Sequence, residues 1–343
     1  MAPGVAVSDA NAELVAEGDL DNLVRHVDRL CRAEAWEDLE DLRHRCRAAL
    51  ERGHQLWPIA SLAEYRLALL APPRWAAGVL ADGAGLWALG PLPEVAASTH
   101  RFAELAPHLT PGPAASTFAR ECAARGEDLT ADVVRGDVER LAHDEGVPLR
   151  LGGWEPRYPV ATYHPDRAEF AGPGLPPTSA FRPLPAATPD PLTSDDAAAA
   201  LRELVEGWSG EPGTTVRTRV AAVDGPAESA VCAVAPGARH WARVQPADAM
   251  ALMAWAAGSG GHTGRRRGLA RGRFDAWWAL AALGGCEQDW PLDPEEVASV
   301  AEGLTWWVFD DAEAPTGWHL RLAVADPIDA LAWAVNASVT ATP

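Results

Sequence analysis

The chain has 343 residues, a length that favours two domains over one. Hydrophobic residues make up 48% and charged residues 22%, a composition typical of a globular protein with a sizeable core. The formal net charge of −19 repels nucleic acid phosphates and anionic membranes over the general surface, so we expect neither as a partner.

The compartment is predicted from the cysteines and from the absence of targeting features. The five cysteines are widely spaced, form no C-x-x-C pair, and mostly fall in apolar helical patterns, as reduced core cysteines do. The first residues show no leader pattern, and no apolar run approaches the ~20 residues that span a bilayer. We therefore expect a cytoplasmic protein.

Residues 1–146 are predicted to form an all-α helical array, because apolar residues recur at helical spacing between Gly and Pro turns. The expected helices are Leu23–Cys31, Trp36–Leu50, Leu56–Leu70, Arg74–Ala81, Pro93–Leu105 and Pro113–Arg125. Helices of this length are typical of a solenoid of helix pairs or of an irregular bundle. No fixed repeat period decides between the two.

Residues 147–192 lose the helical period and become rich in Pro, but they keep five aromatic residues. Aromatic side chains in an extended segment favour packing onto a neighbouring surface over disorder. We interpret this segment as an extended strap, and we expect Tyr158 and Tyr163 to serve packing rather than chemistry.

Residues 193–343 mix strands with helices, which predicts an α+β domain with a small mixed or antiparallel sheet, and an α+β protein overall. The expected strands are Val216–Val220, Ser229–Val234, His240–Val244, Thr305–Phe309 and Gly317–Val324. The expected helices are Ser194–Trp208, Pro246–Ala257, Leu269–Leu283, Pro294–Gly303 and Pro327–Asn336. The turn-rich residues 310–316 predict a hairpin between the last two strands.

Two of these helix starts echo one another. Pro246 and Pro327 each follow an expected strand and are each followed two residues later by Asp, which suits the first turn of a helix. The echo indicates either a duplicated strand–helix unit or two instances of the same helix-start chemistry.

The segment Gly258–Arg273 inverts the sign of the chain, with five arginines, six glycines and no acid. Glycines bring backbone amides close to a ligand at a helix start, and Arg donates in a planar fork to phosphate or carboxylate. The segment matches neither the phosphate loop, which needs Lys-Ser/Thr, nor the dinucleotide fingerprint, which follows a strand. The predicted ligand-binding residues are Arg265, Arg266, Arg267, Arg271, Arg273, Gly261, Gly264, Trp277 and Trp278.

The alternative is a loop whose arginines pair with the chain's own acids. The ligand hypothesis requires these guanidinium groups to stay accessible and unneutralised.

Tryptophan is concentrated in the last third of the chain. Nine of the 15 lie beyond residue 240, and the adjacent pairs at 277–278 and 306–307 cannot both face one side of their elements. Core packing explains most of them, and an aromatic-walled pocket is the alternative. The ten histidines form no metal-ligand motif, so we predict no metal and no cofactor.

These patterns favour a non-enzymatic binding or scaffold protein that holds an acidic protein or a small anion through the Arg/Gly segment. The alternative is an enzyme acting on a phosphorylated or carboxylated metabolite in a Trp-walled cleft. In that case His262 is the nearest acid–base candidate.

Several stretches are familiar in combination: Leu56–Ala68, Ala88–His100, Glu155–Tyr163, Arg265–Ala279 and Gly317–Pro327. Together they resemble a widespread family of proteins from GC-rich actinobacteria that carries no assigned activity. The likeness runs over nearly the whole chain. It implies a cytoplasmic housekeeping or regulatory protein and transfers no catalytic residue.

Overall fold

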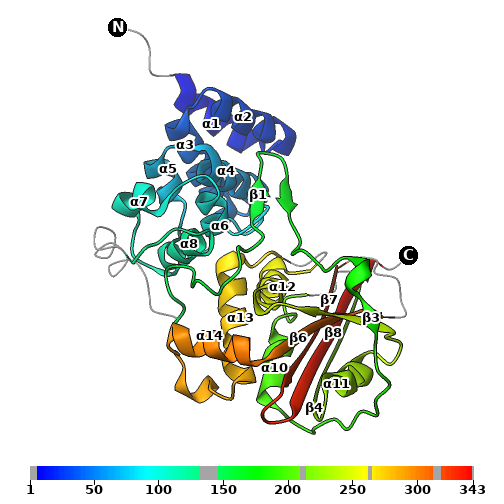
Figure 1. Ribbon diagram of the computed structural model, residues 1–343. Helices are drawn as coiled ribbons and strands as arrows, with labels where there is room; N and C mark the ends of the chain where they lie inside the picture. The colour runs from blue at the N-terminus through cyan, green and yellow to red at the C-terminus, as the bar shows by residue number, and fades with distance from the viewer. Residues whose placement is uncertain (1–5, 131–145, 209–213, 262–264, 312–317, 342–343) are drawn as a thin grey trace. The chain divides into compact units, whose positions relative to one another are not determined.

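The computed structural model describes residues 6–130, 146–208, 214–261, 265–311 and 318–341. The chain forms two compact units, which are taken one at a time (Figure 1). Unit 1 comprises Met1–His143 with Ala161–Phe170, and unit 2 comprises Asp144–Val160 with Ala171–Pro343. Helices in unit 1 and an antiparallel sheet in unit 2 confirm the predicted α+β class.

Unit 1 is a set of helices joined by short turns. The helices are α1 (Ala6–Glu17), α2 (Leu20–Arg32), α3 (Trp36–Glu51), α4 (Trp57–Leu70), α5 (Pro73–Gly78), α6 (Leu92–Ala97), α7 (Phe102–Leu105), the 3₁₀ turn η1 (Ala106–His108) and α8 (Pro113–Ala124). The single helix expected at Pro93–Leu105 is two short ones. Glu104 accepts from the backbone N–H of Arg101 and so starts a new helix there.

Helix α4 lies at the centre of unit 1 and packs against α2, α3 and α6. Almost every residue from Ile59 to Leu69 is buried, as expected for a helix that is apolar nearly all round. Its one buried acid, Glu64, accepts from Arg43 Nε at 3.2 Å and from the backbone N–H of Gly85 at 2.6 Å. These bonds tie the loop before α6 to the core.

The part of the strap at Ala161–Phe170 is a two-stranded hairpin of unit 1, formed by β1 (Ala161–Tyr163) and β2 (Ala168–Phe170). Tyr163 is 6% exposed, and its hydroxyl donates to the buried carboxylate of Glu94 at 2.7 Å. The aromatic side chain thus anchors the hairpin on α6.

Unit 2 is built on a six-stranded antiparallel sheet in the order β3-β5-β6-β7-β8-β4. The strands are β3 (Arg182–Pro183), β4 (Thr214–Asp224), β5 (His240–Val244), β6 (Thr305–Phe309), β7 (Trp318–Asp326) and β8 (Leu331–Ala341). The helices are η2 (Thr178–Ala180), α10 (Asp196–Glu203), α11 (Ala227–Val234), α12 (Pro246–Ser259), α13 (Leu269–Leu283), η3 (Glu287–Asp289) and α14 (Pro294–Gly303). The described strands flanking residues 310–316 pair as the predicted hairpin.

Two predicted elements of unit 2 are wrong, and pairing with the sheet explains both. The expected strand Ser229–Val234 is helix α11, whose small residues pack on the sheet. The expected helix Pro327–Asn336 is a turn followed by β8, which pairs with β4 over eleven residues and with β7 over nine. Such pairing overrides the helical preference of an Ala-rich segment. The echo of Pro246 and Pro327 is therefore not a duplicated strand–helix unit.

The two faces of the sheet have different covers. On one face, Trp333 Nε1 donates to Asp195 at the start of α10, and Trp318 stacks on Trp255 of α12 at 4.9 Å between ring centroids. The other face is covered by α11 over its Ala-rich half only. Neighbouring Trp306 and Trp307 point to opposite faces, as their adjacency in a strand requires.

Among the described residues, no helix combines the length and the apolar character needed to cross a bilayer.

Candidate functional site

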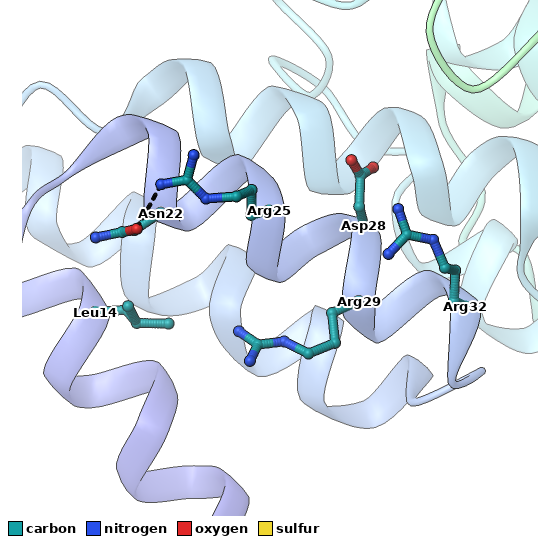
Figure 2. Close-up of a pocket in the computed structure, with 6 residues that line it drawn as sticks. All are labelled: Leu14, Asn22, Arg25, Asp28, Arg29 and Arg32. Carbon is teal, nitrogen blue, oxygen red and sulfur yellow. Dashed lines mark hydrogen bonds between the residues drawn. The ribbon is translucent and has the colours of Figure 1, made fainter.

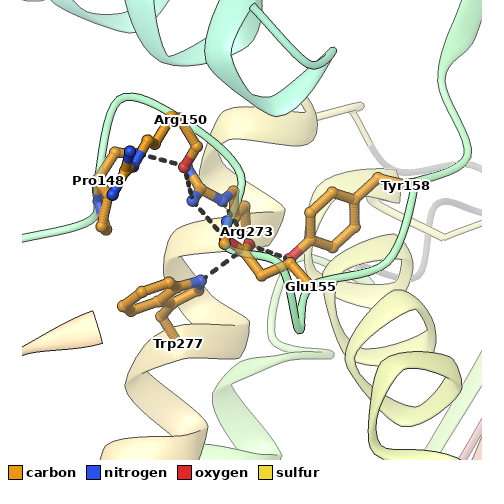
Figure 3. Close-up of polar contacts among 7 residues, drawn as sticks. Pro148, Arg150, Glu155, Tyr158, Arg273 and Trp277 are labelled. Atoms are coloured by element: carbon orange, nitrogen blue, oxygen red, sulfur yellow. Dashed lines mark hydrogen bonds and ion pairs between the residues drawn. The ribbon is translucent and has the colours of Figure 1, made fainter. Parts of the chain in front are cut away.

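Arg273 lies in the interior of unit 2, where it is 2% exposed. Its guanidinium group donates to both carboxylate oxygens of Glu155, at 2.6 and 2.7 Å (Figure 3). It also donates to the carbonyl oxygens of Pro148 and Arg150, at 2.6 and 2.8 Å. Four of the five N–H donors of the side chain are thereby used within the chain. Arg273 holds the strap onto α13, and we do not retain it as a ligand-binding residue.

Glu155 collects the other buried donors around this ion pair. It accepts from the Tyr158 hydroxyl at 2.7 Å and from Trp277 Nε1 at 3.1 Å (Figure 3). Burial alone would raise the pKa of Glu155, but the hydrogen bonds and charge of Arg273 outweigh it and hold this pKa below its usual value. Trp277, with no exposed surface, is thus part of a structural network.

Arg267 and Arg271 share one carboxylate on α13. Their guanidinium groups lie 3.3 and 2.8 Å from the oxygens of Asp275. Burial raises the pKa of Asp275 despite both guanidinium groups, and the nearby charge of Glu206 adds to the rise. The charges of Asp275 and Glu206 also act on Glu203. Two arginines therefore face three carboxyl groups, those of Asp275, Glu203 and Glu206. The positive charge of Arg267 and Arg271 is therefore balanced by acids of unit 2.

The glycines of the segment serve helix packing. A Cβ on Gly272 would lie 2.0 Å from the carbonyl oxygen of Ala254, and one on Gly258 would lie 2.7 Å from that of Gly268. Helices α12 and α13 therefore cross with their backbones in contact. Gly261, with φ +77°, turns the chain against Trp208. In each case the backbone approaches another part of unit 2.

The remaining predicted residues do not complete a site. Trp278 is half-buried and packs edge-on against Trp290, with 5.6 Å between ring centroids. Arg265 is exposed and Arg266 half-buried, and neither is without a partner. His262 and Gly264 lie outside the described residues, so the acid–base role of His262 stays a prediction.

A different basic site lies on α2 in unit 1. A pocket of about 520 Å³ is lined by Leu14, Asn22, Arg25, Asp28, Arg29 and Arg32, a set that we call the α2 groove (Figure 2). The three arginines are four and three residues apart, so they share one face of the helix over about 10 Å. All three are exposed, and Asp28 is paired instead with Arg66 of α4 at 2.9 Å. No described carboxylate forms an ion pair with the three arginines.

The sequence pattern of α2 explains this arrangement. Leu23, Val27 and Leu30 are buried on one side, and the capping oxygen of Asp19 accepts from two backbone amides at the helix start. The opposite side is left to the arginines. An Arg-rich polar face is usually a solvated helix surface, so the spacing alone did not single it out. A signal was present in the Arg-x₃-Arg-x₂-Arg spacing within an acidic chain.

A buried histidine network lies next to Arg29 of the α2 groove. His26 is 4% exposed, and its Nε2 lies 2.7 Å from Asn11 Oδ1. Its Nδ1 lies 2.7 Å from Arg29 Nη2, which can only donate, so Nδ1 is the acceptor and the imidazole is neutral. Burial, followed by the charge of Arg29, lowers the pKa of His26 from 6.5, while Asp38 opposes the shift. Arg29 is thus held by a histidine that resists protonation.

Comparison with known proteins places the chain in a family. A family of unknown function (DUF6183) matches residues 21–331. The chain belongs to this family. Neither the curated proteins nor the solved structures include a match. The match confirms the expectation of a family without an assigned activity, and the matched range includes the arginines of the α2 groove.

This DUF6183 protein also has a histidine–aspartate pair in unit 2, formed by His240 and Asp310. His240 Nδ1 lies 2.8 Å from Asp310, whose other oxygen accepts the backbone N–H groups of Arg239 and His240. Burial alone would raise the pKa of Asp310, but the hydrogen bonds from His240 and Arg239 outweigh burial and lower this pKa. The pair ties β5 to the end of β6. Among the described residues, no three His, Cys, Asp or Glu side chains are grouped to hold a metal ion.

We expect the His26 network of this family member to make unfolding pH-dependent. Because the folded-state pKa of His26 lies below 6.5, its contribution to stability is complete above pH 6.5 and is lost as the pH falls through the folded-state value. Urea unfolding at pH 7.5, 6.5 and 5.5 would measure this against His26→Gln. The gap in unfolding free energy between wild type and variant should narrow at low pH. A gap that stays constant would show that His26 does not titrate in this way.

Proposed function

We propose that this protein binds an acidic segment of a partner protein in the α2 groove. The observation that carries the proposal is the stripe of Arg25, Arg29 and Arg32 beside a pocket, in a chain of net charge −19. The negative charge of the chain as a whole repels anions, so an acidic ligand is attracted only where the local charge is positive. We retain the hypothesis of anion binding from the sequence, but we assign it to α2 instead of to the Arg/Gly segment.

The spacing of the arginines suits an extended segment better than a single small ion. One guanidinium fork can bind one carboxylate through both oxygens, and the stripe offers three forks along about 10 Å. Acids at alternate positions of an extended chain are about 6.6 Å apart, close to the rise of about 6 Å from Arg25 to Arg29. Arg32 extends the stripe by one more turn, and Leu14 supplies an apolar wall from α1.

The proposal is tested with a fluorescently labelled peptide of four Glu-Ser repeats, whose binding is followed by anisotropy at low salt. The double variant Arg25→Ala/Arg32→Ala should bind about tenfold more weakly or worse, because charge-assisted hydrogen bonds contribute about 1.5 kcal/mol or more each. Neither side chain contacts the core, so the fold should be kept.

The matched control is Arg52→Ala/Arg167→Ala, which removes two exposed arginines of unit 1 away from the α2 groove. It changes the net charge equally and should alter the affinity less than twofold. Equal losses in the two variants would mean that only overall charge matters. Unchanged binding in the α2 variant would remove the groove from the proposal.

A cytoplasmic setting is part of the proposal. All five cysteines are free thiols, and Cys46 and Cys122 have no exposed surface. Burial raises the pKa of Cys46 to about 12, so this thiol behaves as an apolar core group. Such use of cysteine supports a reducing compartment.

A further inference from the structure

Half of one sheet face in unit 2 carries polar side chains. Arg219 on β4, Asn336 on β8 and Arg321 on β7 are direct cross-strand neighbours, and so share one face. The next row along the strands is Arg217, Ser338 and His319. We call these six residues the polar sheet face. It holds three arginines and no acid.

Helix α11 covers the other half of the same face. The helix packs on the Ala-rich half of the same face, over residues such as Val223, Ala323 and Ala334. Its C-terminal carbonyl, at Val234, accepts from Asn336 Nδ2 at 3.4 Å. Eight residues of helix are about 12 Å long, whereas an eleven-residue strand is about 37 Å long. The strands therefore extend beyond the part of the sheet that α11 covers.

The two arginines that flank Asn336 have no hydrogen-bond or ion-pair partner among the described residues. Arg219 is exposed and makes no hydrogen bond or ion pair with the described residues. Arg321 is half-buried, and its Nε is buried without an acceptor. A buried guanidinium nitrogen without an acceptor is unusual, because buried donors are nearly always satisfied. Because the Arg321 side chain as a whole is only half-buried, a ligand that reaches its exposed part can supply an acceptor that the described residues do not.

Asn336 lies between these arginines and is held in place. Its Nδ2 donates to Asp311 at 2.9 Å as well as to the end of α11. The amide is thereby oriented, and Oδ1 accepts from none of the described residues. Within the part of the chain that the structure describes, Asp311 is the carboxylate that contacts Asn336, and it has a further partner besides Asn336.

We propose that the polar sheet face binds a phosphate-bearing small molecule, with the phosphate seated over Asn336 between Arg219 and Arg321. Strands β4 and β7 are separated by β8, so the two Cα atoms lie about 10 Å apart, a span that two long side chains close from both sides. A carboxylate offers only two oxygens to the two guanidinium groups, and when ionised it has no proton to donate to Asn336 Oδ1. A phosphate has enough oxygens for both, and a protonated oxygen donates to Asn336 Oδ1.

The test is titration of the full chain with inorganic phosphate and with glycerol 3-phosphate, followed by ³¹P NMR line broadening. Arg219→Ala/Arg321→Ala should weaken binding of the preferred ligand at least tenfold. Arg182→Ala/Arg243→Ala, which removes two exposed arginines from β3 and β5 of the same sheet, should change it less than twofold. Arg219→Lys/Arg321→Lys keeps the charge but loses the forks, and should bind at least threefold more weakly than wild type.

Tighter binding of the ester than of free phosphate identifies an esterified ligand, and the reverse identifies the free ion. The α2 variant Arg25→Ala/Arg32→Ala separates this site from the α2 groove, because adding Arg219→Ala/Arg321→Ala to it should still weaken phosphate binding at least tenfold. Equal losses in the β4/β7 and β3/β5 Ala variants overturn the proposal, as does wild-type affinity in the Lys variant. Tighter binding of an eight-residue oligothymidylate than of either phosphate also overturns it, in favour of a nucleic acid surface.

Discussion

Replacing Arg273 by Ala should cost unit 2 about 3–5 kcal/mol of unfolding free energy, the range found when one partner of a buried ion pair is removed. The side chains of Arg273 and Glu155 are 2% and 0% exposed, so solvent cannot take over the role of either. The variant leaves the Glu155 carboxylate charged and buried with only neutral donors. It also frees the carbonyl oxygens of Pro148 and Arg150.

Urea unfolding followed by tryptophan fluorescence would measure this effect. The matched control is Arg271→Ala, two residues earlier on α13, whose side chain is 50% exposed and whose partner Asp275 keeps Arg267. It should cost less than about 1 kcal/mol, as exposed pairs do. Glu155→Gln should also be strongly destabilised, because it leaves the Arg273 charge buried. Similar costs for Arg273→Ala and Arg271→Ala would show that the Glu155 pair does not hold the strap.

Gly272→Ala is expected to be the other severe change, at about 3 kcal/mol, because the added methyl group overpacks the crossing of α12 and α13. Its Cβ would lie 2.0 Å from the Ala254 carbonyl oxygen and 3.0 Å from the Gly258 nitrogen. Both are backbone atoms, so no side-chain rotation relieves the clash. The two helices must separate, and their buried apolar contacts weaken.

Thermal unfolding would compare Gly272→Ala with Gly303→Ala, which places the same methyl group at the end of α14. No atom lies within 4 Å of a Cβ there, and the backbone conformation is not left-handed. The control should be neutral or slightly stabilising, since Ala restricts the unfolded chain more than Gly does. A melting temperature of Gly272→Ala equal to that of Gly303→Ala would mean that the helices are not in backbone contact.

These two positions change the interpretation of the Arg/Gly segment. Both Gly272 and Arg273 belong to the stretch that the sequence marks as a basic, glycine-rich ligand site. In the structure, the glycine lets two helices touch and the arginine fixes a strap from 118 residues earlier in the chain. Close backbone approach and two-pronged donation are the properties predicted, but the groups approached belong to the protein itself.

Local sequence patterns were sufficient to predict many of the helices and strands. The predicted α13 and α14 have the bounds that the structure shows, because an apolar helical period is bordered at each end by glycine or proline. The strand His240–Val244 was likewise found from its alternation. Where the period was ambiguous, as in Ser229–Val234, the sequence could not distinguish a strand from a short buried helix.

The chain's residues by themselves determined the α+β class, the helical character of the first half, and the burial of Tyr158 and Tyr163 in the strap. These properties follow from composition and from periodicities that act over a few residues. Only the tertiary structure decided which charges meet. Asp275 pairs with Arg267 and Arg271, and Glu155 pairs with Arg273, whereas Arg25, Arg29 and Arg32 of α2 form no ion pair with a described carboxylate. The reason is physical: electrostatic pairing depends on distance in space, and the carboxylate of Glu155 reaches its partner only through folding.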